Sequence, residues 1–147
     1  MPDLSKFWSA PRQEKFFLVE ALTWLLISHI SVKILAFKWI HRFLDRYSSY
    51  RTDTSDRIDD IKLINKSVLR AAHRLPFRTL CLSRSIASFI MFRERGIPAV
   101  LCAGVKPDGS ALLAHAWVHV GTGAISRDLE NTVFPIVMKI GQVPANL

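Results

Sequence analysis

Residues 76–96 of the chain read PFRTLCLSRSIASFIMFRERG. Proline disfavours helical geometry in the residue before it, so Pro76 should end any helix that precedes it. Apolar residues then recur at helical intervals, and Gly96 followed by Pro98 is typical of a helix end. The stretch therefore predicts a loop over 76–80 and a helix over 82–95, with Cys81 at the helix N-terminus.

Downstream of this helix the pattern changes to that of β-strands. Residues 99–105 form one strand-like run, a Pro-Asp-Gly-Ser turn follows at 107–110, and a second run covers 112–120. A Gly-Thr-Gly turn then leads to a short third run that reaches Asp128. We expect a helix followed by an antiparallel meander.

Upstream, the spacing of apolar residues predicts more helices. One covers residues 61–75, and a polar connection over 48–60 precedes it. Between Phe16 and Tyr47 the pattern predicts two helices or one bent helix, with basic residues on a separate face. That basic face is either solvated or a docking surface for a partner.

The apolar N-terminal part is long enough to raise the question of a membrane span. Its longest charge-free segment is the 12-residue stretch 21–32, whereas a bilayer needs about 20 nearly uncharged residues. A buried or interfacial helix is the better interpretation, and contact with a membrane surface stays open.

Composition bounds the protein class. The chain has 147 residues, of which 50% are apolar and 22% charged, so we expect one compact domain over 1–147 and neither a disordered nor a fibrous protein. The net charge is +8, but acidic residues are interleaved with the basic ones throughout the chain, and no nucleic-acid-binding motif is present. We therefore expect no nucleic-acid partner. An acidic peptide or protein partner would explain the positive charge as well as a nucleic acid would.

The two cysteines give an expectation about compartment. No basic leader followed by an apolar core and a small-residue cleavage site opens the sequence. Cys81 and Cys102 are therefore expected to be thiols in a reducing cytoplasm.

The chemistry is concentrated in three residues. At a helix start, unpaired N–H groups and the helix dipole favour a thiolate at Cys81 and can stabilise an oxyanion. A nucleophilic thiol also needs an imidazole base and a group that orients it. His115 lies in the second strand and Asp128 follows the next one, so both can return to the helix end. Taken singly, each residue has an ordinary structural interpretation.

The spacing of His115 and His119 argues against a metal site. Strand alternation puts His115, Trp117 and His119 on one face, but the two histidines are then about 13 Å apart, too far for one tetrahedral zinc ion. We expect no metal and no cofactor, and we expect Cys102 to be a core residue.

Several segments together resemble a known family. The residues concerned are Pro76 to Ser85, Arg95-Gly96-Ile97-Pro98-Ala99, Ala103-Gly104-Val105 and Ala114-His115-Ala116-Trp117-Val118. This pattern resembles the transglutaminase-like cysteine peptidases of lasso-peptide biosynthesis, the B proteins. The similarity extends from about Ile61 to Asp128, and the apolar helical N-terminal segment is similar too.

The resemblance implies an α+β fold of the papain-like and transglutaminase-like kind. In it the N-terminal helices, residues 1–50, and a catalytic helix pack on a small antiparallel β-sheet, with the catalytic core over 61–147. It implies a Cys-His-Asp leader peptidase, with Cys81 as nucleophile, His115 as base and then acid, and Asp128 orienting the imidazole. Residues beside this site are expected to bind the peptide: Arg78, Arg84, Trp117 and His119.

The resemblance also implies partners. The family cuts a ribosomally made precursor between leader and core, and an ATP-dependent cyclase then uses the released core amine. The chain is similar to the stand-alone form of the peptidase, which works with a separate leader-recognition protein.

Two departures leave alternatives. The family commonly has an acidic residue where this chain has His119. The interval from His115 to Asp128 is also about one residue longer here than in that family. Glu130 and Asn131 therefore remain candidates for the third catalytic position. An amine acyltransferase of the same fold and a noncatalytic scaffold protein are the alternative functions.

Overall fold

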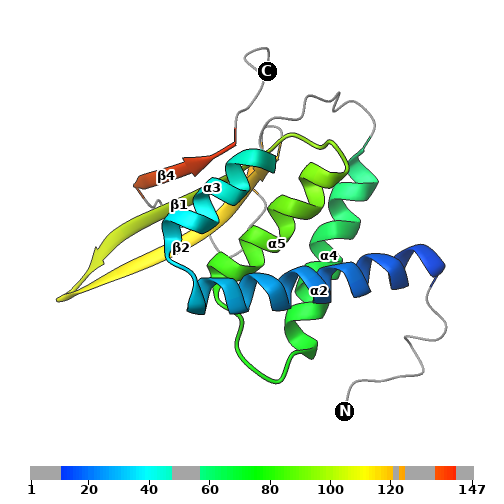
Figure 1. Ribbon diagram of the computed structural model, residues 1–147, viewed down its shortest axis with the longest axis horizontal. Helices are drawn as coiled ribbons and strands as arrows, with labels where there is room; N and C mark the ends of the chain where they lie inside the picture. Colours follow the sequence, from blue (N-terminus) through cyan, green and yellow to red (C-terminus); the bar gives the residue numbers. More distant parts are fainter. Residues whose placement is uncertain (1–10, 48–56, 121–122, 125–134, 142–147) are drawn as a thin grey trace.

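The computed structural model describes residues 11–47, 57–120, 123–124 and 135–141. Within them the helices are α2 (Arg12–Ile34), α3 (Phe37–Tyr47), α4 (Ile58–Arg74) and α5 (Cys81–Glu94), and the strands are β1 (Ala99–Asp108), β2 (Ala111–Val120), β3 (Gly123–Ala124) and β4 (Ile136–Ile140). The strands form one antiparallel sheet in the order β3-β2-β1-β4. Figure 1 shows the helices gathered on one side, with the long β1-β2 hairpin extending away from them. The expected α+β architecture is confirmed.

Helix α5 lies at the centre of the fold. Every residue from Ser85 to Arg93 is buried. The helix contacts α2 and α4 on one side and the strands β1 and β2 on the other. A helix that is buried all round organises the elements around it, because each of them covers a different part of its surface.

The sheet has two different faces. Alternation along β1 and β2 puts Leu101 and Val118 on the face that joins the main core, together with Ile140 of β4. A second, smaller buried cluster consists of Val100, Cys102 and Trp117, from the intervening positions on the same strands. The two faces of the hairpin therefore take part in separate clusters.

Ion pairs connect α2 to the two helices beneath it. Glu14 pairs with Lys66 and Arg70 of α4, at 3.2 Å in each case. Hydrogen bonding and charge from Lys66 hold the pKa of Glu14 below its usual range. Glu20 forms a two-pronged pair with Arg95, directly after α5. These contacts fix α2 across α4 and α5.

The helices agree closely with the sequence patterns. The segment from Phe16 to Tyr47 forms two helices separated at residues 35–36, and α5 begins at Cys81 as predicted. The predicted C-terminal boundary of the connection over 48–60 is wrong, because α4 already begins at Ile58. Acidic residues in the first turn of a helix complement its dipole, and the first turn of α4 contains Asp59 and Asp60. Residues 48–56 lie outside the described residues.

The strands are longer than the sequence suggested. β1 continues to Asp108, so the hairpin loop is reduced to Gly109 and Ser110, with Gly109 at a φ of 63°. Of the third run only Gly123–Ala124 is described. Strand β4 was not predicted, and it pairs with β1 at the opposite edge of the sheet from β3.

Gly141, directly after β4, provides a test of this packing. Its φ is 100°, and a Cβ there would lie 2.7 Å from the carbonyl oxygen of Ala99. We expect Gly141→Ala to lower the free energy of unfolding by about 1–3 kcal/mol, measured by urea denaturation. Gly109→Ala is the control, because Gly109 also has a positive φ but nothing lies within 4 Å of its added Cβ. The close packing would be contradicted if Gly141→Ala lowered the free energy of unfolding no more than Gly109→Ala does.

Candidate active site

Cys81 is the first residue of α5 and is half-buried. The residue before it, Leu80, has extended geometry, and its carbonyl accepts the N–H of Arg84 at 3.1 Å. The first N–H groups of any helix have no partner within the helix. The thiol of Cys81 therefore stands beside backbone donors that are suited to bind an oxyanion.

A buried hydrogen bond fixes this end of α5 against β2. Ser85 lies one helical turn after Cys81 on the same side of the helix, and its Oγ donates to the carbonyl of Ala116 at 3.0 Å. Ala116 is the neighbour of His115 in β2. The helix turn that follows Cys81 is thus attached to the strand at the residue next to the histidine.

His115, Trp117 and His119 share one face of β2, as the alternation predicted. The rings of His115 and Trp117 are stacked, with centroids 6.2 Å apart and an interplanar angle of 15°. The indole Nε1 of buried Trp117 donates to Nε2 of His119 at 2.9 Å. Nε2 of His119 acts as an acceptor, so a neutral His119 carries its proton on Nδ1.

The indole of Trp117 also affects whether His115 and His119 could share a metal ion. The indole of Trp117 lies between the two histidines and occupies Nε2 of His119. Across the residues that the structure describes, no group of three or more His, Cys, Asp or Glu side chains is placed to hold a metal ion.

The side chain of His115 lies on the opposite face of β2 from Ala116 and Val118, and Val118 belongs to the core around α5. The contact from Ser85 is made to a backbone carbonyl, which lies between the two faces. If Cys81 and His115 form a catalytic pair, the thiol must therefore reach the imidazole around an edge of β2 and not across the face that α5 covers. The sequence pattern gave no indication of this constraint.

The remaining predicted residues are dispersed. Arg78 is exposed in the loop before α5, and Arg84 is half-buried in the first turn of that helix. Asp128 and its alternatives Glu130 and Asn131 lie outside the described residues. The third catalytic position and the peptide-binding residues stay predictions.

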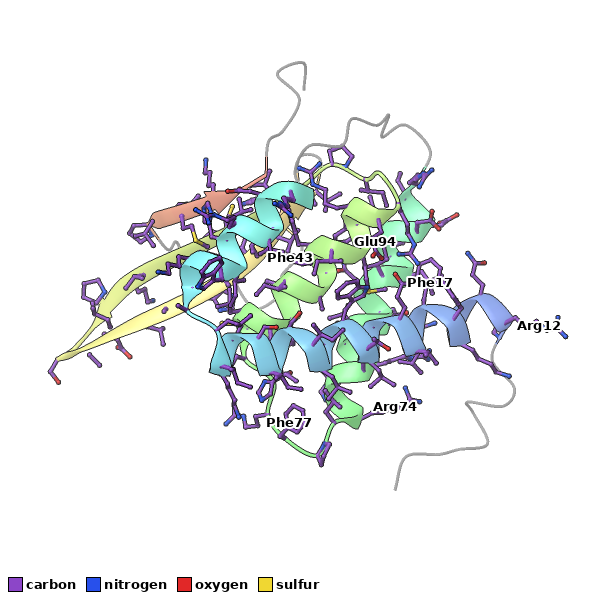
Figure 2. All side chains as sticks on the ribbon, in the orientation of Figure 1. Arg12, Phe17, Phe43, Arg74, Phe77 and Glu94 are labelled. Atoms are coloured by element: carbon purple, nitrogen blue, oxygen red, sulfur yellow. The ribbon has the colours of Figure 1, made fainter. Side chains whose placement is uncertain are left out.

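One contact that positions the site was missed by sequence reasoning. His29 of α2 is buried, and its ring stacks on Phe77 with centroids 4.5 Å apart. Phe77 belongs to the loop that enters α5 four residues later, and Figure 2 shows it beside α2. The two residues are far apart in the sequence, so no local pattern could have paired them. The stack attaches the loop before Cys81 to α2.

The second cysteine is a core residue, as predicted. Cys102 is 1% exposed and lies opposite Trp117 in the β1-β2 pairing. Burial raises the pKa of the Cys102 thiol. Its environment therefore disfavours the reactive thiolate.

Comparison with known protein families identifies the family of the chain. Residues 24–137, more than three quarters of the 147-residue chain, match the family model described as the Transglutaminase-like superfamily. The match contains α3, α4, α5, β1 and β2 in full, together with Cys81 and His115. No curated protein and no solved structure matches the chain.

The two thiols should differ in reactivity. With iodoacetamide at neutral pH we expect the folded protein to be alkylated at Cys81 at least about tenfold faster than at Cys102, because Cys102 is buried and its pKa is raised. Mass spectrometry of peptides from samples quenched at successive times measures both rates. In denaturant the difference should disappear. Equal rates in the folded protein would contradict the burial of Cys102.

Proposed function

Because the chain belongs to the Transglutaminase-like superfamily, whose members are often cysteine peptidases or acyltransferases, we propose that it is a cysteine peptidase. We further propose that its substrate is a ribosomally made lasso-peptide precursor, which it cuts between leader and core. The observation that carries the peptidase proposal is the hydrogen bond from Ser85 to Ala116, which holds the helix that begins at Cys81 against the strand beside His115. The motif resemblance of residues 61–128 supports the choice of substrate.

In this mechanism the thiolate of Cys81 attacks the carbonyl carbon of the last leader residue. The carbonyl electron pair moves onto the oxygen, where the N–H groups at the start of α5 stabilise it. The carbonyl then re-forms, the bond to the core nitrogen breaks, and His115 as imidazolium gives its proton to the departing amine. The leader remains attached to Cys81 as a thioester.

Water completes the reaction. His115, now neutral, takes a proton from a water molecule, whose oxygen attacks the thioester carbonyl. The carbon–sulfur bond breaks, and the thiolate of Cys81 is regenerated with a protonated His115. The leader leaves as a carboxylic acid, which loses its proton to the solvent. Asp128 holds the imidazole in the tautomer that this cycle requires.

The proposed partners follow from this chemistry. A separate leader-recognition protein delivers the precursor, and an ATP-dependent cyclase consumes the free core amine. Arg78 lies before α5 and Arg84 in its first turn. We propose that both contact acidic groups of the peptide or of these partners. No metal or cofactor is needed for any of these steps.

The nucleophile and base can be tested together. We expect Cys81→Ala and His115→Ala to reduce leader cleavage by on the order of a thousandfold or more, because the two groups act as a unit. The assay incubates a candidate precursor with the purified chain and a leader-recognition partner, and mass spectrometry follows the products. Cys102→Ala and His73→Ala, the second at an exposed histidine of α4, are the matched controls, one for each residue type, and both should keep kcat within about tenfold of wild type.

The products separate the possible outcomes. A single cut at the leader–core junction that only the first two variants lose would support the peptidase. An amide formed between the leader and an added amine would assign the chain to the acyltransferases instead. Cleavage retained in Cys81→Ala would exclude Cys81 as the nucleophile.

The third catalytic position needs its own variant. We expect Asp128→Asn to lower kcat by roughly a hundredfold to ten thousandfold with little change in KM, because the imidazole loses its orienting carboxylate. The same mass-spectrometric assay, run over a range of precursor concentrations, gives both constants. Activity like that of wild type would move the role to Glu130 or Asn131, which Glu130→Gln and Asn131→Ala then distinguish.

A further inference from the structure

Helix α2 has two apolar faces, and only one of them is covered. The buried face packs on α4 and α5 and includes Phe17, Leu18, Ala21 and Leu25. A surface helix normally presents polar residues on its other side. The other side of α2 instead carries an apolar stripe that consists of Phe16, Val19, Ile27, Ile30 and Ile34.

The apolar stripe is long and exposed. Its residues recur at intervals of three, four or eight positions, which places them on one side of the helix, opposite the buried face. Between Phe16 and Ile34 it extends about 27 Å along the helix axis. The two end residues are 64% and 75% exposed, and the three between them are also exposed. Figure 1 shows α2 at the outside of the helical layer.

The stripe continues into a basic and aromatic junction, residues 33–39, which joins α2 to α3. Leu35 and Phe37 are exposed there, and Trp39 at the start of α3 is 53% exposed. Cations approach the Trp39 ring: Nζ of Lys38 lies 5.8 Å from its centroid and the guanidinium of Arg42 lies 5.5 Å away. Lys33 adds a further positive charge at the end of α2.

Of the acidic side chains on α2 and α3, only that of Asp45 is largely exposed. Within the described part of α2 and α3 the carboxylates belong to Glu14, Glu20 and Asp45. Glu14 is paired with cations of α4 and Glu20 with Arg95 directly after α5, and Asp45 is 3.0 Å from His41. Thr23, whose hydroxyl donates to the carbonyl of Val19, is the polar residue within the stripe. The surface is therefore mainly apolar along its length and positive at its junction.

We propose that the apolar stripe of α2 and the junction 33–39 bind the surface of a membrane that contains anionic phospholipids. Apolar side chains of a helix that lies in the interface enter the boundary between headgroups and acyl chains, while cations contact the anionic headgroups. Tryptophan with neighbouring cations suits this level of the bilayer, because its ring is apolar and its N–H is polar.

The helix would lie along the membrane and not cross it. By length and composition α2 is apolar enough to span a bilayer, but part of its apolar window is already buried inside the protein. Its inner face shares the core with α4 and α5 and carries the ion pairs of Glu14 and Glu20. Crossing the membrane would break these contacts, whereas binding in the plane leaves them intact.

Flotation of the full chain with lipid vesicles tests the proposal. We expect the protein to float with vesicles of phosphatidylglycerol and phosphatidylcholine in equal amounts and to stay at the bottom with phosphatidylcholine alone. Two double variants, Ile30→Gln with Ile34→Gln and Lys38→Glu with Arg42→Glu, should each lower the bound fraction by about tenfold or more. High salt should release the wild-type protein.

Matched controls change exposed residues elsewhere. Leu112→Gln with Val137→Gln alters two exposed apolar residues of the sheet, and Lys62→Glu with Arg74→Glu reverses two exposed charges of α4. Both controls should float like wild type, and circular dichroism with thermal unfolding checks that every variant is folded.

Three results would overturn the proposal. The first is a wild-type protein that does not float with the anionic vesicles. The second is a pair of surface variants that float as well as the controls do. The third is a wild-type dimer, measured by light scattering, that Ile30→Gln with Ile34→Gln converts to a monomer, which would make a second copy of the chain the occupant of the stripe.

Discussion

The complete burial of α5 is the constraint on which the other parts of the structure depend. Its side chains from Ser85 to Arg93 are enclosed, so no side of this part of the helix is available to water. Helices α2 and α4 must therefore cover it from one direction and the hairpin from the other. The start of the helix is the place where this enclosure ends, and Cys81 is half-buried there. A rigid core thus holds a thiol at the margin of the protein interior.

The two faces of the hairpin carry different groups of side chains. One face of β2 packs into the core through Val118 and Val120. The other carries the rings of His115, Trp117 and His119, of which the first two are stacked and the last two meet edge to face. Ser85 links the two systems, because it belongs to the buried helix but bonds to the backbone of the strand beside His115. The backbone of β2 is thereby held to the buried helix at Ala116, next to His115.

The N-terminal helices belong to the folded unit of this family. The family match begins within α2 and includes the whole of α3. Helix α2 adds to the core and, through His29 and Phe77, fixes the loop that precedes Cys81. Its outer face is apolar as well, which core packing does not require. One helix therefore combines a structural face with a face suited to a membrane surface.

The sequence by itself determined those features whose causes are local. Pro76 and Gly96 delimit α5 through backbone geometry, strand alternation groups His115 with Trp117 and His119, and the motif around Cys81 indicates the superfamily. The tertiary structure alone decided which face of each element is covered. It buried one side of α2 and exposed the other, although both are apolar, and it added β4 at the edge of β1. It also paired His29 with Phe77 and Ser85 with Ala116. Such contacts join residues distant in the chain, and no local periodicity encodes which distant partner a side chain meets.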